Sequence, residues 1–318
     1  MPVTHDASVQ HLSDMMNNPK RVVLDTDTYN EVDDQFALAH LLMSPEAVDL
    51  EAVYAAPFFN HRSTGPEDGM LRSYDEIHRV LDLVDPEKRP KVFRGSTAYL
   101  PTMNTPVDSE AVNDLVERAL SVPARETLYV VAIAAATNVA SALLTAPEIA
   151  QKITVVWLGG HGPHWPHTRE FNLQQDPYAA HVLLDSNVPL VLLPCYPVVS
   201  HLITTVAELE DQLAPFSALG RYLTDIVRNY EGNPPGWSKI IWDISASAWV
   251  VNSSWLKTER QPAPILKKDL TWELRSHRRK IEIAREVDRD AIFADFFARA
   301  RSSSEKSLSS QNNNLQPA

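Results

Sequence analysis

The chain has 318 residues and a mass of 35.6 kDa, enough for one large domain or two smaller ones. Its formal net charge of -12 and pI near 5.4 argue against a nucleic-acid partner. The single cysteine, Cys195, excludes an internal disulfide and is expected to be an inert core thiol in a reducing compartment. We find neither a signal-peptide core nor an apolar run of membrane-spanning length, which predicts a cytoplasmic protein without membrane contact.

Composition divides the chain into three parts. Residues 1–20 form an N-terminal extension, and residues 21–300 contain regularly spaced apolar runs that predict one domain. Residues 301–318 are rich in Ser, Asn and Gln and almost free of large apolar side chains. We therefore expect this tail to be disordered.

Between residues 21 and 300, short apolar runs alternate with amphipathic ones. The runs predict buried strands at 22–24, 49–54, 91–94, 127–133, 153–158 and 189–193. Helical spacing predicts helices at 68–84, 108–120, 135–144, 176–184, 206–230 and 243–251, followed by a β-rich stretch at 270–283 and a closing helix from 288. This alternation predicts an α/β fold with an open, mostly parallel central sheet flanked by helices, with a Rossmann-like core.

Four aspartates follow the first predicted strand: Asp25, Asp27, Asp33 and Asp34. They lie on the strand, its exit loop and the start of the next helix, which is where open α/β sheets place their ligands. Carboxylates packed this closely must share protons or hold a cation, and hard oxygen ligands favour Ca²⁺ or Mg²⁺. The alternative is that Asp25 and Asp27 cap local structure while Asp33 and Asp34 are solvated.

The run at 24–38, LDTDTYNEVDDQFAL, resembles the aspartate-rich signature of the inosine–uridine-preferring nucleoside hydrolase family, which are Ca²⁺-dependent N-ribohydrolases. Further matches in the family's order are APFFN at 56–60, AAATNVASAL at 134–143, EFNLQQDPYAA at 170–180 and WDISASAW at 242–249. The resemblance extends from residue 21 to about 297. It implies hydrolysis of a ribonucleoside to ribose and base by a Ca²⁺-bound water, in a homodimer or homotetramer.

The resemblance also implies roles for individual residues. Asp27 would ligate Ca²⁺ and take the proton of the attacking water, and Asp25 would support the site from behind. The other implied metal ligands are Asp34, the Thr137 carbonyl and Asp243. The implied ribose contacts are Asp33, Asn60, Glu170 and Asn172.

Two loops depart from the family pattern. The segment between Asp27 and Asp33 is two residues longer than the usual Pro-Gly linker, so Tyr29 or Glu31 could reshape the metal site. The loop HGPHWPHTR before Glu170 lacks the Asn that often contacts the ribose 5′ side, and His164 or Trp165 could replace it. Its three histidines could instead bind a transition metal, but its prolines favour a substrate-closing loop.

Trp242 stands where some family members carry a histidine that protonates the leaving base. An indole cannot act as a general acid, so stacking on a purine is the expected role, as in the family's purine-preferring branch. Simple packing at a helix start is the alternative for Trp242.

Two other functions remain open from the sequence. The DTDT run at 25–28 superficially resembles haloacid-dehalogenase phosphatases, with Asp25 as nucleophile, but no matching Lys is evident. A nucleoside- or ribose-binding pseudoenzyme would keep the cation and ribose contacts and lose turnover through the longer linker and altered loop.

Overall fold

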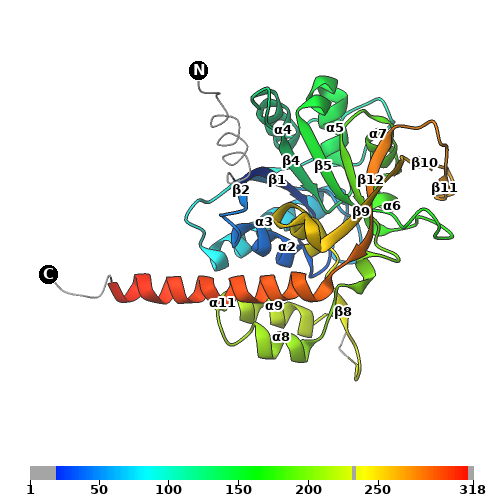
Figure 1. Ribbon diagram of the computed structural model, residues 1–318. Helices are drawn as coiled ribbons and strands as arrows, with labels where there is room; N and C mark the ends of the chain where they lie inside the picture. Colours follow the sequence, from blue (N-terminus) through cyan, green and yellow to red (C-terminus); the bar gives the residue numbers. More distant parts are fainter. Residues whose placement is uncertain (1–18, 231–233, 314–318) are drawn as a thin grey trace, which may run out of the picture.

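The computed structural model describes residues 19–230 and 234–313, with side chains to residue 303. Its centre is an eight-stranded sheet of order β3-β2-β1-β4-β5-β6-β12-β9 (Figure 1). Every neighbouring pair is parallel except β12 and β9, so the mostly parallel sheet is confirmed. The strands are β1 (Lys20–Thr26), β2 (Val48–Ala55), β3 (Lys91–Arg94), β4 (Leu128–Ala132), β5 (Ile153–Leu158), β6 (Leu190–Leu193), β9 (Leu256–Pro262) and β12 (Lys280–Val287).

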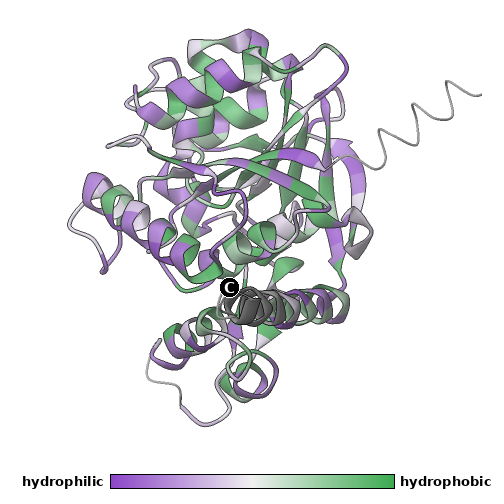
Figure 2. Cartoon of the chain, turned by 90° about the vertical axis from the view of Figure 1, so that its left-hand side faces the viewer, coloured by the Kyte–Doolittle hydropathy of each residue, from purple (hydrophilic) through white to green (hydrophobic). Residues whose placement is uncertain are grey.

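Helices cover both faces of this sheet, as Figure 1 shows. Alternate strand residues pack into two separate cores: Val22 and Leu24 into one, Val23 into the other. The first core is covered by α2 (Asp34–Leu42), α3 (Pro66–Val84), α10 (Ile244–Val251) and α11 (Arg289–Asn313). The second is covered by α4 (Glu110–Leu120), α5 (Thr137–Thr145) and α7 (Pro177–Asp185). The hydrophobic faces of the helices turn inward and their hydrophilic faces outward (Figure 2).

The smaller elements lie at the rim of this core. Two helices, α8 (Val206–Gln212) and α9 (Ala218–Arg228), lie on the far side of α11 from the sheet (Figure 1). A short helix, α6 (Phe171–Gln175), precedes α7. The remaining elements are the two-residue strands β7 (Ile203–Thr204), β8 (Lys239–Ile240), β10 (Ile265–Leu266) and β11 (Trp272–Glu273) and the 3₁₀ turns η1 (Pro147–Gln151), η2 (Val199–His201) and η3 (Ser253–Trp255).

Three expectations about the elements need correction. The helical stretch predicted at 206–230 is two helices, α8 and α9, because Pro215 lies between them. Strand β9 was missed, since its sequence LKTERQP is polar and it forms the sheet edge. Residues 301–313 of the predicted disordered tail belong to α11, which is anchored by buried residues such as Phe293 and Phe296, whereas residues 314–318 lie outside the described residues.

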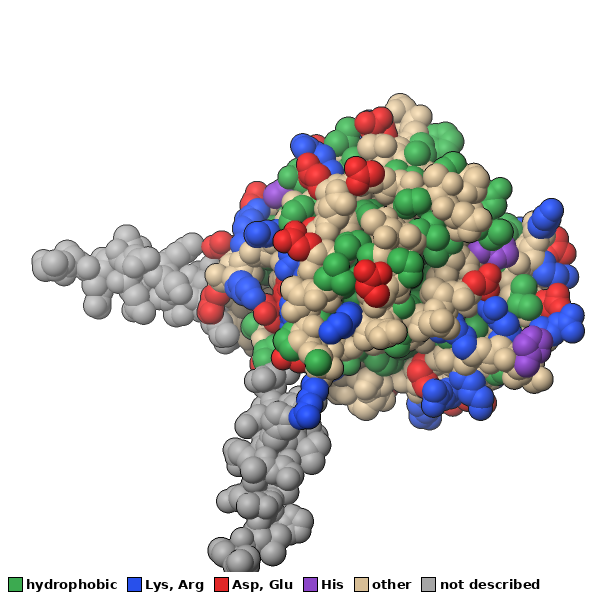
Figure 3. Space-filling model, turned by 90° about the horizontal axis from the view of Figure 1, so that it is seen from above, with side chains coloured by type: hydrophobic (Ala, Val, Ile, Leu, Met, Phe, Trp, Pro, Cys, Tyr) green, Lys and Arg blue, Asp and Glu red, His purple; other side chains and the backbone are tan. Residues whose placement is uncertain are grey.

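Most of the predicted N-terminal extension, residues 1–18, lies outside the described residues, and Lys20 already belongs to β1. Within residues 19–230 and 234–313, no helix combines the length and apolar character needed to cross a bilayer. Acidic and basic side chains are interspersed on the face seen in Figure 3, where no extended basic surface is visible.

The connection pattern predicts where a ligand binds. Strand β1 pairs with β2 on one side and with β4 on the other, so the chain reverses its winding direction at β1. Ligands of open α/β sheets bind at such a switch point, beyond the carboxyl ends of the strands. Asp25 lies near the end of β1, and Asp27 is the residue after it. The acidic run is therefore at the expected position for a site.

Candidate active site

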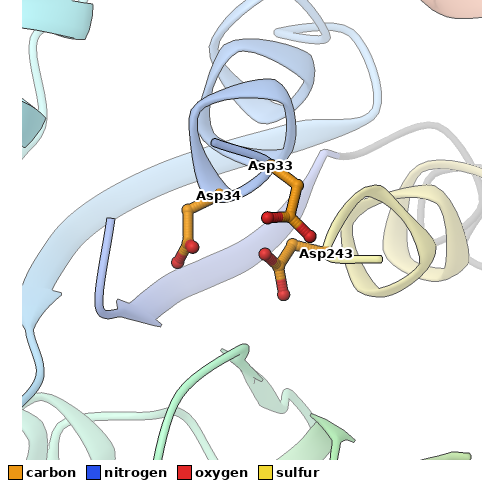
Figure 4. A group of neighbouring side chains, drawn as sticks. All are labelled: Asp33, Asp34 and Asp243. Carbon is orange, nitrogen blue, oxygen red and sulfur yellow. The ribbon is translucent and has the colours of Figure 1, made fainter. Parts of the chain in front are cut away.

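Three carboxylates converge beyond the end of β1. Asp33 and Asp34 come from the start of α2 and Asp243 from the start of α10, and their side chains point toward one another (Figure 4). One carboxylate oxygen from each lies within 4.8 Å of the others, and all three residues are buried. The fold thus joins residues 209 positions apart in one buried acidic cluster.

Helix termini partly explain how this charge is tolerated. Asp33 precedes α2 and Asp243 precedes α10, so free N–H groups and the positive end of each helix dipole lie nearby. Burial still outweighs this help. It raises the pKa of Asp34 to about 7 and that of Asp33 to about 6, and it raises the pKa of Asp243 well above its usual range, with further repulsion from Asp34 and Asp33.

The cluster also has unused acceptors. Among the described residues, the Oδ2 atoms of Asp25, Asp27 and Asp34 are buried without a hydrogen-bond partner. Buried carboxylate oxygens normally have partners, and several of them together fit a cation that the chain does not itself supply. All donors are hard oxygens, which suits a hard divalent ion. The residues present therefore fit a metal ion.

Asp27 lies next to the three clustered acids. It is fully buried, and its Oδ1 accepts a hydrogen bond of 2.5 Å from the Asn30 side chain. Burial and the negative charge of Asp34 raise its pKa well above the usual range. The convergent group within 4.8 Å includes Asp33, for which the family resemblance implies a ribose contact, and does not include Asp27, for which it implies metal ligation. Asn30, from the longer linker, is a contact that the family pattern could not predict.

Asp25, which the family resemblance predicts as a supporting residue, is a buried carboxyl near the end of β1. Its Oδ1 accepts a 2.8 Å hydrogen bond from Asn138 Nδ2, and Asn138 Oδ1 accepts from the backbone and hydroxyl of Ser96 at 2.8 Å each. Burial raises the pKa of Asp25 to about 7. Asn138 lies in the matched run at 134–143 but was not predicted as a site residue.

Removing the Asn138 side chain is expected to destabilise the fold. Asn138→Ala leaves the buried Asp25 carboxyl and two donors of Ser96 without their hydrogen-bond partner. This loss should lower the free energy of unfolding by about 3 kcal/mol. Urea unfolding measures this. Asn113→Ala, on an exposed helical position, is the control and should cost less than about 0.5 kcal/mol. Equal stability of the two variants would contradict the role given to Asn138.

A buried lysine contacts the cluster. Lys239, on β8, is 5% exposed, and its Nζ lies 3.5 Å from Asp33 Oδ1 and in hydrogen-bonding contact with the Glu31 carboxylate. Burial lowers the pKa of Lys239, but the charges of Asp33 and Glu31 outweigh this effect and raise it. Lys239 is thus a cation, and nothing in the sequence pattern had pointed to it.

The other predicted site residues each make hydrogen bonds within the chain. Thr137 is buried at the start of α5 and donates its hydroxyl to Asp176 Oδ2 at 2.8 Å. Asn60 donates to the Asn30 carbonyl at 3.1 Å. Glu170 caps α6 by accepting from the backbone of Asn172 and Leu173, and Asn172 donates its side-chain amide to the Leu158 carbonyl at 3.1 Å. Their proposed contacts to metal and ribose stay predictions.

Aromatic side chains border the cluster. The half-buried Trp242 donates its backbone N–H to Asp33 Oδ2 at 3.0 Å and meets Tyr196 edge-on, with centroids 5.4 Å apart. Trp165 stacks on Tyr196 at 5.4 Å with 13° between the rings. Tyr196 was missed, although its position after β6, at a strand's carboxyl end, is a usable signal.

The histidine-rich loop does not form a ligand group. Among the described residues, the three histidines at 161, 164 and 167 are not gathered with other ligands as a metal site would require. His161 is buried and packs against Trp165, His167 and Tyr196, whereas His164 is exposed. Cys195 is buried, and burial together with the charge of Glu170 raises its pKa well above the usual range, consistent with an inert thiol.

Fold and site together define an α/β protein with a buried cluster of carboxylates at its switch point. The sequence matches the model of the inosine-uridine preferring nucleoside hydrolases over residues 22–294. The chain belongs to this family, and it is therefore a glycosidase that hydrolyses ribonucleosides. The predicted resemblance, fold and enzyme class are confirmed. No curated protein matches in a sequence search.

Solved structures agree with this fold. The purine-preferring ribonucleoside hydrolase of Gardnerella vaginalis is 21% identical, covering 90% of this chain and 99% of its own, with a TM-score of 0.70. An inosine-uridine preferring nucleoside hydrolase of Bacillus anthracis is 20% identical over 89% of this chain and 99% of its own, with a TM-score of 0.66. An inosine-guanosine nucleoside hydrolase is 16% identical over 90% of this chain and 98% of its own, with a TM-score of 0.69.

Proposed function

We propose that the chain hydrolyses the N-glycosidic bond of purine ribonucleosides, using Ca²⁺ held by the acidic cluster. The observation that carries this is the convergence of Asp33, Asp34 and Asp243 beside buried carboxylate oxygens that lack partners. The proposed ligands are Asp27, Asp34, Asp243 and the Thr137 carbonyl. A calcium ion there would fix the vicinal hydroxyls of the sugar and acidify a water molecule.

The chain's own residues would perform the remaining steps. Asp27 accepts the proton of the attacking water, since its Oδ2 is free of any other partner while Asn30 holds Oδ1. Asp33 accepts a hydrogen bond from a ribose hydroxyl, with Asn60, Glu170 and Asn172 as further sugar contacts. The surrounding carboxylates favour the positive charge that develops on the sugar ring. No side-chain nucleophile takes part.

The base would lie against the aromatic group. Trp242 is adjacent to Asp33 and is half-buried, so one part of its ring can contact a ligand. Trp165 and His164 are exposed on the loop before Glu170, which suits closure over the substrate. Two of the similar structures are named as a purine-preferring ribonucleoside hydrolase and as an inosine-guanosine nucleoside hydrolase. These observations favour purines over uridine.

A nucleoside panel tests this proposal. Release of free ribose from inosine, guanosine, adenosine and uridine would be measured with Ca²⁺ and with a chelator. We expect faster cleavage of the purine nucleosides and loss of release on chelation. Faster cleavage of uridine would refute the purine preference. Calcium binding without ribose release from any nucleoside would instead favour a pseudoenzyme.

The role of Trp242 makes a separate prediction. Trp242→Ala should raise the KM for inosine about tenfold or more, because base–aromatic stacking contributes about 1–3 kcal/mol per base. Trp242→Phe keeps a stacking surface and should stay within about threefold of the wild type. Steady-state kinetics of both variants would be compared. An alanine variant with unchanged KM would show that Trp242 only packs.

Cytoplasmic location and a homodimeric or homotetrameric state stay predictions. Both follow from the family resemblance and the sequence composition, and size-exclusion chromatography with light scattering measures the second.

A further inference from the structure

Lys239 links the longer linker to the acidic cluster. Its Nζ contacts two carboxylates, Glu31 of the linker and Asp33 of the cluster, and lies 5.2 Å from the centre of the Tyr230 ring. The Lys239 side chain is 6% exposed, whereas that of Glu31 is 35% exposed. The ammonium group is therefore buried between the acidic cluster and the linker, and moving it into solvent would break both ion pairs.

The linker is held in place by neighbouring residues. Arg62 donates to the Glu31 carbonyl at 2.7 Å, and its guanidinium lies 4.4 Å from the centre of the Tyr29 ring. Asn60 donates to the Asn30 carbonyl at 3.1 Å. Glu31 thus has a fixed backbone, and its carboxylate meets Lys239 in a defined position.

The charge of this pair acts on the cluster. Among the ion pairs of the described residues, Lys239 supplies the only cation in contact with Asp25, Asp27, Asp33, Asp34 or Asp243. A buried charge this close to a cation site changes its affinity strongly, because solvent screens it poorly. The positive charge of Lys239 lowers the affinity of the site for a divalent ion, and the negative charge of Glu31 partly cancels this effect.

We propose that Lys239 is a positioning residue that holds the Asp33 carboxylate for the sugar, and that the Glu31–Lys239 pair sets the cation affinity of the site. This inference rests on the proposed function. Lys239 fixes Asp33 Oδ1, while the Trp242 backbone fixes Oδ2 at 3.0 Å. Within this site, the longer linker supplies the acidic partner that keeps a buried lysine compatible with Ca²⁺ binding.

Two substitutions that break the same ion pair should shift calcium affinity in opposite directions. Lys239→Met removes the opposing charge and should lower the Kd for Ca²⁺ about tenfold in the metal-stripped protein. Glu31→Gln leaves Lys239 uncompensated and should raise this Kd about tenfold. A purely structural role of the pair predicts shifts of the same sign. Isothermal titration calorimetry with Ca²⁺ alone gives both values without any activity measurement.

Kinetics separate positioning from charge. At saturating Ca²⁺, Lys239→Met should raise the KM for inosine about tenfold with a smaller change in kcat, because Asp33 loses one of its two fixing partners. Lys239→Arg restores the charge and should return the calcium Kd to within about threefold of the wild type. The exposed pair Lys257–Glu286 offers matched controls, Lys257→Met and Glu286→Gln, expected to leave Kd and KM unchanged.

The outcomes distinguish this inference from the proposed function. Opposite shifts in Kd with a raised KM in Lys239→Met support the inference. Shifts of the same sign, or none, in protein whose wild type binds Ca²⁺ and releases ribose overturn the inference alone. If Lys239→Met does not fold, Glu31→Gln decides, since an unchanged or lower Kd in that variant contradicts the proposal. Wild-type protein that neither binds Ca²⁺ nor releases ribose contradicts the proposed function instead.

Discussion

Asp27→Asn is expected to lower the rate of ribose release by about 10³-fold or more, because the variant loses the proposed general base. The change is nearly isosteric. The new side-chain carbonyl can still accept the hydrogen bond that Asn30 donates to Oδ1, so the linker should keep its conformation. Initial rates with inosine at saturating Ca²⁺ measure the effect.

Asp27→Asn should not lower the thermal stability of the protein. The Asp27 carboxyl is fully buried and its Oδ2 has no hydrogen-bond partner. At neutral pH, burying a neutral amide there costs less free energy than burying a carboxylate. Metal-free Asp27→Asn should therefore melt at the same temperature as the wild type or higher. Asp82→Asn, on an exposed carboxylate of α3, is the matched control and should leave both activity and melting temperature unchanged. Near-full activity of Asp27→Asn would overturn the assigned role of Asp27.

Metal-free protein is expected to lose stability as the pH rises from about 4 to about 7. In the folded state the pKa is raised to about 7 for Asp25 and Asp34 and to about 6 for Asp33, above the value near 3.9 of an unfolded chain. The folded state thus binds protons more tightly than the unfolded state over this range. By linkage, the free energy of unfolding falls as the pH passes through this range.

Calcium should reverse this trend because it replaces the lost protons. At about 100 times Kd it adds about 2.7 kcal/mol, which corresponds to a rise in melting temperature of roughly 4 °C at pH 8. The rise should shrink at pH 5, where protons compete for the carboxylates. Asp34→Asn should abolish most of it. Differential scanning calorimetry at both pH values tests this, and a calcium-induced rise that is as large at pH 5 would contradict the account.

The sequence identified the part of the site that is local in the chain. Asp25, Asp27, Asp33 and Asp34 lie within ten residues, and a strand followed by a helix is enough to place them at a switch point. Asp243 is different. It reaches the cluster only through tertiary packing of α10 against α2, so family resemblance was needed to find it.

Residues that entered the site through the longer linker could not be predicted. Asn30 contacts Asp27 from inside the run at 24–38, but at a position that departs from the family pattern. Lys239 contacts Asp33 from outside every matched run, across 206 positions. Strand β9 and the end of α11 also could not be predicted from the sequence. A polar edge strand and a polar helix end lack the hydrophobic periodicity from which sequence analysis predicts elements.

Ca²⁺-dependent hydrolysis can be tested by ribose release from inosine in ¹⁸O-labelled water, using protein first stripped of metal and then supplied with Ca²⁺. We expect no release from the stripped protein, restored release with Ca²⁺, and one ¹⁸O atom at the anomeric carbon of ribose with none in the base. Equal release with and without the metal, or a product that carries no label from water, would contradict it.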